Sequence, residues 1–329
     1  MSLHLSIDLQ KALSKGSFST RETWERDEFS AHVGWNTEYL QLEPGQYNAE
    51  VNFSIHSNLR LAWSVSNLKS AATATPPANH LAVFLPIANQ PQITCQGRTM
   101  QKNEVAIICP NSKVVVRLPG DFEMITLTLS RADLKPRIRS LVESPPRQFT
   151  DGVFVTRVPD VNLKKLVRVC QGMIEYRKQP HSTGLVNSIK KMELNITELL
   201  SEAIVSADRT PPAKRALKNR FTIFHKARKY INSRLGTSLS LKAIAADAGV
   251  SPRTLDYAFR DCLGITPLAY IKTRRLAAAR RLLLNAIPQE TRVHDIAEAC
   301  GFKHMGHFAR DYGLQFLELP SETLTKKSV

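Results

Sequence analysis

Two stretches near the carboxyl end repeat one pattern of apolar, small and glycine residues, and this repeat constrains the fold more than any other feature. The first reads IAADAGVSPRT at 244–254 and the second reads IAEACGFKHMG at 296–306. In each stretch, apolar residues spaced for one helical face precede a glycine, which can adopt the left-handed conformation of a sharp turn. The small residue Ala245 allows a following helix to approach closely. The sequence therefore predicts two helix-turn-helix motifs in tandem.

The second helix of the first motif has well-marked ends. Ser251 is a favoured N-cap residue, Pro252 suits the first helical position, and Gly264 can end the helix. We expect a buried stripe at every fourth residue, formed by Leu255, Phe259 and Leu263.

The second motif departs from the first in ways that weaken its second helix. The apolar stripe falls on Phe308 and Tyr312, one residue later relative to the glycine. No Ser-Pro cap precedes this helix, a loss of typically ~1 kcal/mol, and Gly306 costs up to ~1 kcal/mol against alanine. The segment ends in FLELP at 316–320, without the glycine that ends the first copy. We expect the second motif to be the less rigid of the two.

The segment between the motifs, PLAYIKTRRLAAARRLLLNA at 267–286, has no internal Gly or Pro and predicts a strong helix. Such a helix holds two recognition helices at a fixed distance, so that they reach successive turns of the major groove, about 34 Å apart. One chain can then read an asymmetric site without a palindrome. The arginines of this helix are expected to be solvated or to face phosphates: Arg274, Arg275, Arg280 and Arg281.

In these stretches, 244–283 and 293–324, the sequence resembles the AraC/XylS family of bacterial transcription regulators, and the likeness covers roughly 221–324. The resemblance implies a bacterial regulator that binds promoter DNA and responds to a small molecule. Members of this family are most often activators that contact RNA polymerase, so we expect an activator.

Four residues of the first predicted recognition helix lie away from its apolar stripe. Arg253 can donate two hydrogen bonds to a guanine, and Asp256 can accept one from a cytosine. Tyr257 and Arg260 suit either bases or phosphates, which position the protein without specifying sequence.

On the second predicted recognition helix, the outward residues are Lys303, His304, Met305, His307 and Arg310. The two histidines are spaced like metal ligands, but no Cys or carboxylate stands at a partner spacing, so we predict no metal site. The resemblance places the family's base contacts mainly at Arg253, Asp256, Tyr257, Met305 and Arg310.

The positive charge of the chain is concentrated at its carboxyl end. Residues 211–329 hold 21 Lys and Arg against 9 Asp and Glu, whereas residues 1–131 hold 11 of each kind. The whole chain has a formal net charge of +16. A basic carboxyl-terminal third beside a neutral amino-terminal part indicates a polyanionic partner for the former, and a solvated basic surface is the alternative.

The amino-terminal half alternates in a way typical of short strands. Period-2 runs at 51–65 and 113–130, the second interrupted by Pro-Gly-Asp, predict two hairpins. Further short strands are expected at 81–87, 91–97 and 104–110. The pattern predicts a small antiparallel barrel or sandwich, and a barrel of this kind can hold a small ligand. It resembles the cupin-like sensor domains of the same family. The expected fold is therefore α+β, with a cupin-like antiparallel β-barrel followed by an all-α domain.

Aromatic residues of this half are candidates for an effector pocket, with plain core packing as the alternative: Trp35, Tyr39, Phe53, Trp63 and Phe84. Its histidines, His32, His56 and His80, stand alone, without the spacing of a cupin metal site. There is no G-x-S-x-G motif, phosphate-binding glycine loop or recognisable pair of catalytic carboxylates. We predict no cofactor and no enzymatic activity.

Residues 160–205 change to a helical period and predict a pair of helices. The second helix carries a heptad-like seam at Leu185, Ile189, Met192, Ile196, Leu199 and Ala203. Two interpretations remain open. The seam packs onto the barrel, or it forms a homodimer interface within 160–205.

The basic, Pro-containing segment 206–220 is the expected linker. It divides a cupin-like effector-binding and dimerisation domain (1–205) from a DNA-binding domain (221–329). Five scattered cysteines without a CxxC pair indicate a reducing compartment. No apolar run approaches the ~20 residues of a membrane span, and the start lacks a secretory signal. We expect a cytoplasmic, nucleoid-associated protein.

Three functions are consistent with the sequence. The first is a transcription regulator that responds to a small organic effector. The second is a DNA-binding protein whose barrel only dimerises, and the third is an enzyme fused to a DNA-binding module. The absence of metal and catalytic spacing counts against the third, and only a ligand distinguishes the first two.

Overall fold

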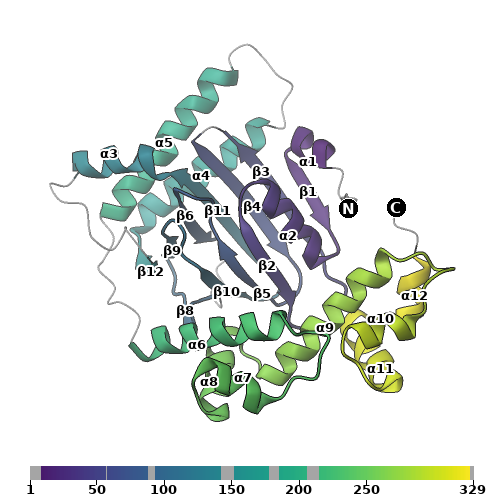
Figure 1. Ribbon diagram of the computed structural model, residues 1–329. Helices are drawn as coiled ribbons and strands as arrows, with labels where there is room; N and C mark the ends of the chain where they lie inside the picture. Colours follow the sequence, from purple (N-terminus) through teal and green to yellow (C-terminus); the bar gives the residue numbers. More distant parts are fainter. Residues whose placement is uncertain are drawn as a thin grey trace.

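The strands of the amino-terminal half form two antiparallel sheets that face each other (Figure 1). In the part of the chain that the structure describes, the sheets do not close into the predicted β-barrel, and the arrangement agrees with the sandwich, the alternative that the strand pattern left open. The computed structural model describes residues 9–56, 58–87, 93–141, 152–177, 185–205 and 215–326. The larger sheet has the strand order β1 (Ser17–Thr20), β3 (Ala49–Ile55), β4 (Leu59–Ser66), β11 (Phe122–Ser130), β6 (His80–Pro86), β9 (Glu104–Ile108) and β12 (Val153–Arg157). The smaller sheet has the order β2 (Asn36–Gln41), β5 (Ser70–Thr75), β10 (Val114–Leu118), β7 (Thr94–Cys95) and β8 (Arg98–Thr99).

Alternation along each strand decides which side chains lie between the sheets. On β11, Met124 belongs to the core between the sheets, whereas Ile125 and Leu127 belong to the core on the outer face of the larger sheet. On β10, Val116 faces the core between the sheets and Val115 faces the carboxyl-terminal helices. Both sheets are therefore covered on both faces. Because both faces of each sheet are covered, the apolar runs of the strands do not alternate with polar residues as they would in a sheet with one solvated face.

One predicted hairpin is confirmed and the other is wrong. Within 51–65, β3 pairs with β4, with Phe53 opposite Ala62. Within 113–130, β10 pairs with β5 and β7, whereas β11 pairs with β4 and β6. The Pro-Gly-Asp turn therefore carries the chain from one sheet to the other. The strands that pair with β10 and β11 lie far from them in the sequence, so the local sequence pattern could not predict these pairings.

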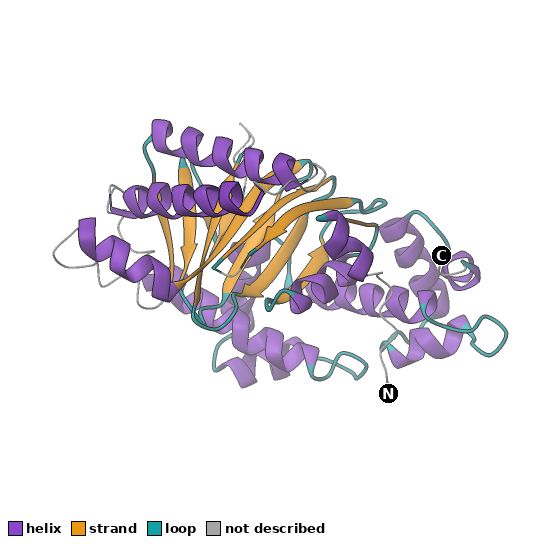
Figure 2. Cartoon of the chain, turned by 90° about the horizontal axis from the view of Figure 1, so that it is seen from above, coloured by secondary structure: helices purple, strands orange, loops and turns teal. Residues whose placement is uncertain are grey.

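Three helices cover the outer face of the larger sheet, α3 (Arg131–Leu141), α4 (Asp160–Arg177) and α5 (Leu185–Val205) (Figure 2). The predicted seam of α5 packs against the core beneath these helices through Ile189, Met192, Ile196, Leu199 and Ala203. This seam is used within the chain, as the first of the two interpretations expects.

The carboxyl-terminal region is helical from Arg215 to Thr325, and its helices are α6 (Arg215–Asn232), α7 (Leu241–Ala248), α8 (Pro252–Leu263), α9 (Pro267–Leu284), α10 (Val293–Ala299), α11 (Met305–Phe316) and α12 (Pro320–Thr325). Two separate cores share α9. Its first turns, with Tyr270 and Ile271, pack with α6, α7 and α8, and its last turns, with Leu276 and Leu283, pack with α10, α11 and α12. We refer to residues 215–326 as the helical region.

The predicted turn and cap chemistry of the first motif is confirmed. Gly249 is left-handed at φ 72°, and the Ser251 side chain accepts a hydrogen bond from the backbone N–H of Thr254. Gly264 ends α8 at φ 76°. In the second motif, His304 at the N-cap of α11 provides no side-chain cap.

The helical region packs directly against the outer face of the smaller sheet (Figure 1). Leu40 of β2, Ala71 of β5 and Val115 of β10 share one core with Phe224 of α6 and Phe259 of α8. The predicted linker 206–220 falls partly outside the described residues, and its last six residues, from Arg215, belong to α6.

Two short helices, α1 (Leu9–Lys15) and α2 (Thr23–His32), precede β2. Phe29 of α2 stacks on Phe18 of β1 and lies against Phe53 of β3, so α2 covers one edge of the space between the sheets. None of the described helices combines the length and the hydrophobicity that crossing a membrane requires.

Candidate nucleic-acid interface and cavity between the sheets

The outward residues of α8 are held in two pairs on its exposed surface. The guanidinium of Arg253 donates to the hydroxyl of Tyr257 at 3.1 and 3.2 Å. Arg260 Nε lies 2.7 Å from Asp256 Oδ2. Arg253, Tyr257 and Arg260 are exposed and Asp256 is half-buried, while Leu255 is fully buried beneath them. The side chains predicted to contact bases on α8 therefore lie on the outer surface of the helix and are paired with one another.

The five predicted DNA contacts of the second motif lie in the turn before α11 and on the first half of that helix. Lys303, His304, His307 and Arg310 are exposed, whereas Met305 is half-buried against the core of its motif. The ring centroids of His304 and His307 lie 5.7 Å apart. Among the described residues, no group of three or more His, Cys, Asp or Glu side chains is arranged to hold a metal ion. The two histidines therefore belong to an exposed polar surface.

The two recognition helices stand at opposite ends of α9. Figure 1 shows α8 beside the first turns of α9 and α11 beside its last turns. Gly236, in the loop after α6, lies against the second motif, because a Cβ there would meet the backbone oxygen of Ala299 at 2.5 Å. Arg275 of α9 donates to the backbone oxygens of Leu235 and Thr237 at 2.9 and 2.6 Å. The motifs are thus joined by this loop as well as by α9.

A cluster around Glu38 of β2 joins the smaller sheet to the helical region. Glu38 pairs with Arg228 of α6 at 2.8 Å and with Arg274 of α9 at 3.3 Å. Its carboxylate also accepts from Asn232 at 3.0 Å and from the Tyr270 hydroxyl at 3.4 Å. Burial alone would raise the pKa of Glu38, but Arg274 and Arg228 hold it below its usual value. Glu38 is therefore an ionised anchor at this interface.

A second cluster joins α2 to the second motif. Arg280 Nη2 lies 2.8 Å from Glu22 Oε1, and Arg280 Nη1 lies 2.7 Å from Glu318 Oε1. Nearby, Arg281 Nη2 lies 2.8 Å from Glu28 Oε1. Burial raises the pKa of Glu22 above its usual value, although Arg280 opposes that shift. Arg280 thus bridges an acid from each part of the chain.

The prediction that the α9 arginines are solvated or face phosphates is wrong for the three that are half-buried and bind groups of the chain, Arg274, Arg275 and Arg280. Arg281 pairs with Glu28 but is exposed, as expected. Sequence reasoning also missed their partners Glu22, Glu28 and Glu38. The available signal was charge complementarity, since the basic helical region faces a half of the chain that holds as many acids as bases.

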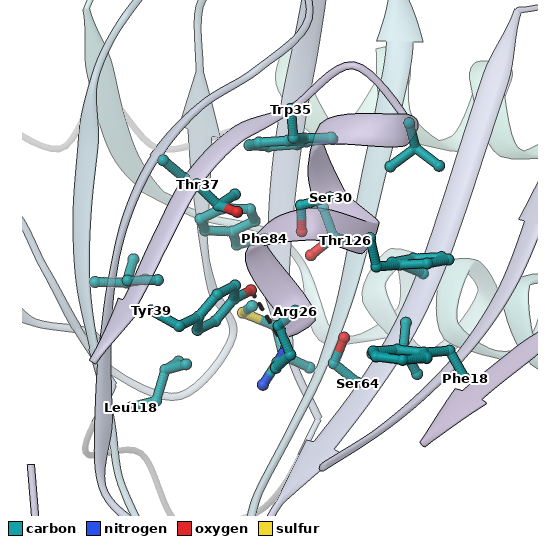
Figure 3. Close-up of a pocket in the computed structure, with 18 residues that line it drawn as sticks. Phe18, Arg26, Ser30, Trp35, Thr37, Tyr39, Ser64, Phe84, Leu118 and Thr126 are labelled. Carbon is teal, nitrogen blue, oxygen red and sulfur yellow. Dashed lines mark hydrogen bonds between the residues drawn. The ribbon is translucent and has the colours of Figure 1, made fainter. Parts of the chain in front are cut away.

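A partly open cavity of about 80 Å³ lies between the two sheets, under α2 (Figure 3). Of the predicted pocket residues, Trp35, Tyr39 and Phe84 line it, and Phe53 lines a smaller cavity that shares several of its wall residues. Trp63 lines neither cavity, because its position on β4 points to the outer core, where it packs beneath the helices. The inward-facing aromatic residues thus line a cavity, and their role in binding an effector stays a prediction.

The wall of this cavity contains a charged group that sequence reasoning did not select. Arg26 of α2 is 3% exposed and lines the cavity together with the hydroxyl-bearing Ser30, Ser64 and Thr126 (Figure 3). The next residue, Asp27, points elsewhere and accepts from the backbone N–H of Tyr39 at 2.8 Å. Burial raises the pKa of Asp27 to about 8.

Comparison with known proteins covers the helical region. Residues 225–326 match the model of a helix-turn-helix domain. The XylDLEGF operon transcriptional activator 2 of Pseudomonas putida is 36% identical over 102 residues, which are 31% of this chain and 65% of that protein. The probable thc operon regulatory protein of Rhodococcus erythropolis is 38% identical over 29% of each chain. The chain thus spans less than two thirds of the length of these curated relatives.

Two solved structures are also similar. A probable AraC family transcriptional regulator from Rhodopseudomonas palustris is 37% identical, with a TM-score of 0.29, over 31% of this chain and 94% of that chain. The AraC-like transcriptional activator CuxR is 17% identical, with a TM-score of 0.41, over 86% of this chain and 99% of that chain.

Proposed function

The helix-turn-helix region of this chain belongs to the AraC/XylS family of transcription regulators, and from this premise we propose that the whole protein is a promoter-binding transcription activator that responds to a small organic effector. One observation carries the proposal. Two recognition helices with exposed polar surfaces stand at the two ends of one helix, and that helix is anchored by ion pairs to a part of the chain that contains a cavity.

In this proposal, the first motif reads bases through Arg253, Asp256 and Tyr257, with Arg260 on a base or phosphate. The second motif contacts the next turn of the major groove through four exposed residues, Lys303, His304, His307 and Arg310. Met305, half-buried at the helix start, offers an apolar edge for a thymine methyl group. Because α8 carries its cap and α11 does not, the first motif sets the register on DNA.

The experiment for DNA binding is selection of bound sequences from a random pool, followed by binding measurements across salt concentrations. We expect an asymmetric two-part site and an affinity that falls steeply with salt, because phosphate contacts release counterions. A flat salt response, or the absence of any selected sequence, would contradict the proposal.

We further propose the division of the chain that the sequence suggests. Residues 1–205 form a cupin-like effector-binding and dimerisation domain, 206–220 a linker whose last six residues begin α6, and 221–329 the DNA-binding domain. The protein acts in the bacterial cytoplasm, on the nucleoid, and recruits RNA polymerase. Because the inner seam of α5 is occupied within the chain, a homodimer through 160–205 would use the outer surface of α4 and α5, where Leu194 is 48% exposed. Sedimentation of wild type and Leu194→Glu tests this: loss of a dimer in the variant is expected.

The second candidate is a DNA-binding protein whose sheet domain only dimerises. This function gives no role to the cavity between the sheets. Thermal unfolding of the full chain with a panel of small organic compounds distinguishes the two. Stabilisation by one compound, together with a change in DNA affinity, supports the effector-responsive regulator. If no compound stabilises the chain and DNA affinity never changes, the second candidate is favoured.

A further inference from the structure

The aromatic ring of Tyr257, on the recognition helix α8, lies near two guanidinium groups. The guanidinium carbon of Arg220, on α6, is 5.6 Å from the centre of the ring, and that of Arg253, one turn earlier on α8, is 5.7 Å from it. The Tyr257 hydroxyl also accepts hydrogen bonds from Nε and Nη2 of Arg253, at 3.2 and 3.1 Å. Arg220 and Arg253 are therefore linked through one tyrosine side chain.

The guanidinium of Arg220 is itself held against α8. Its Nη1 donates to Oδ2 of Asp261, which lies one turn after Tyr257 on that helix. The two helices also share a core contact, in which the rings of Phe224 and Phe259 meet edge to face with centroids 5.0 Å apart. The core contact fixes the distance between α6 and α8, and the ion pair holds the guanidinium of Arg220 near the Tyr257 ring.

The hydrogen bonds to Tyr257 leave one defined edge of Arg253 for DNA. Nε and Nη2 form the side edge of the guanidinium, and the tyrosine hydroxyl occupies that edge. The end edge, with one N–H on Nη1 and one on Nη2, donates two parallel hydrogen bonds. Such a pair of donors matches O6 and N7 of a guanine. Arg253 can thus meet a guanine without giving up its contact with Tyr257.

This support matters because exposed side chains are otherwise free to rotate. An arginine has several rotatable bonds and loses that freedom when it binds a base. Tyr257 is 42% exposed, so packing alone does not fix its ring. The face of an aromatic ring attracts a cation, and Arg220 supplies one from a second helix. A tyrosine fixed in this way orders Arg253 before DNA arrives and lowers the entropy lost on binding.

We propose that Arg220 is a positioning residue for base reading: it fixes Tyr257, and Tyr257 fixes Arg253 in the orientation that reads a guanine. The inference rests on the proposed function, in which Arg253 contacts a base. Arg220 is the last residue of the predicted linker and lies on α6, so the periodicity of α8 could not select it. Its effect is on sequence preference and not only on affinity for DNA in general.

The test measures discrimination at one base pair in the selected site. That base pair is the one at which Arg253→Ala loses its preference, and discrimination is the ratio of the dissociation constants for the changed and the selected site. We expect Arg220→Gln to lower this ratio about two- to fivefold, the size of an exposed cation–π contact. Preference at the other base pairs should stay as in wild type. Loss of a phosphate contact weakens both sites alike and cancels in the ratio.

A double-mutant cycle shows whether Arg220 acts through the tyrosine. Tyr257→Phe keeps the ring but removes the acceptor for Arg253, so we expect it to lower the same ratio. Adding Arg220→Gln to Tyr257→Phe should cause little further loss, because the link to Arg253 is already broken. Arg220→Lys keeps a cation near the ring and should recover part of the discrimination.

The matched control is Lys226→Gln, which removes the same charge from an exposed position of α6 and should leave the ratio unchanged. If Arg220→Gln does not fold, Asp261→Asn takes its place in the cycle, because it releases the Arg220 guanidinium from its ion pair. The inference is overturned if Arg220→Gln keeps the wild-type ratio, if it relaxes all base pairs equally, or if its loss adds in full to that of Tyr257→Phe. Specific DNA binding with an unchanged ratio overturns this inference alone, whereas the absence of any selected sequence overturns the proposed function as well.

Discussion

Glu38 and Tyr39 are neighbours on β2 whose side chains serve opposite faces of the smaller sheet. Tyr39 lines the cavity between the sheets and accepts a hydrogen bond from Arg26. Glu38 reaches the other way and pairs with Arg228 and Arg274 of the helical region. The wall of the cavity and the ion pairs that hold the helical region are therefore only one peptide unit apart along β2.

Glu38→Gln tests the importance of that anchor. The variant keeps an acceptor but removes the charge opposite two arginines, so we expect the free energy of unfolding to fall by about 1–3 kcal/mol. Chemical denaturation of the full chain measures this value. Glu198→Gln is the matched control, because Glu198 pairs with Arg137 at an exposed site and should cost under about 0.5 kcal/mol. Equal losses in both variants would show that the Glu38 cluster is no stronger than a surface pair.

Arg253→Ala tests direct base reading by α8. We expect a loss of about 1–3 kcal/mol on the selected site and relaxed preference at one base pair, because a bidentate contact discriminates between bases. Competition binding on the selected site and its single-base variants measures both effects. Arg234→Ala removes the same charge from an exposed position outside the recognition helices and should weaken all sites alike. If Arg253→Ala behaves like Arg234→Ala, Arg253 contacts phosphate and does not read sequence.

Asp27→Asn tests how the stability of the folded chain depends on pH. The carboxyl of Asp27 has an ordinary pKa of 3.8 and a folded-state pKa of about 8, raised by burial. The folded chain therefore holds a proton that the unfolded chain releases between these values. This contribution to stability is fully present below about pH 4 and is lost as the pH rises through about 8. Asparagine does not titrate and keeps the acceptor for the Tyr39 N–H.

We therefore expect the unfolding temperature of Asp27→Asn, relative to wild type, to rise from pH 5 to pH 8 and to level off above about pH 9. Thermal unfolding of both proteins at each pH measures this difference in unfolding temperature. The contributions of the other titrating groups are common to both proteins and cancel in the difference. A constant difference across this range would mean that Asp27 titrates near its ordinary value.

Leu317→Gly tests the strain at the end of the second motif. Leu317 has φ 56° in the left-handed region and is 64% exposed, so its side chain loses little packing when removed. A non-glycine residue there costs about 1–2 kcal/mol, and glycine is the usual residue at this position of a helix end. We expect the free energy of unfolding to rise by about 0.5–1 kcal/mol. The same change at the exposed helical residue Leu314 should lower it by a similar amount. Two changes of the same sign would refute the strain argument.

Local signals predicted the two helix-turn-helix motifs correctly. Ser251, Gly249 and Gly264 act within a few residues of the chain, and the stripe of Leu255 and Phe259 follows from helical period alone. The alternation of 51–65 likewise predicted a hairpin whose partners are neighbours in sequence. The DNA-contact set on α8 and α11 follows from the same periodicity and stays a prediction.

The amino-acid sequence by itself thus determined the motifs, their caps and the concentration of positive charge at the carboxyl end, because these depend on neighbouring residues and composition. Only the tertiary structure decided that β10 and β11 belong to different sheets, since their partners lie far along the chain. Only the tertiary structure shows that Arg26 lines a cavity. Only the tertiary structure shows that Arg280 pairs with Glu22 and Glu318 and does not face solvent. A helical period shows which residues share a face of α9, but the packing of another part of the chain decides which face is covered.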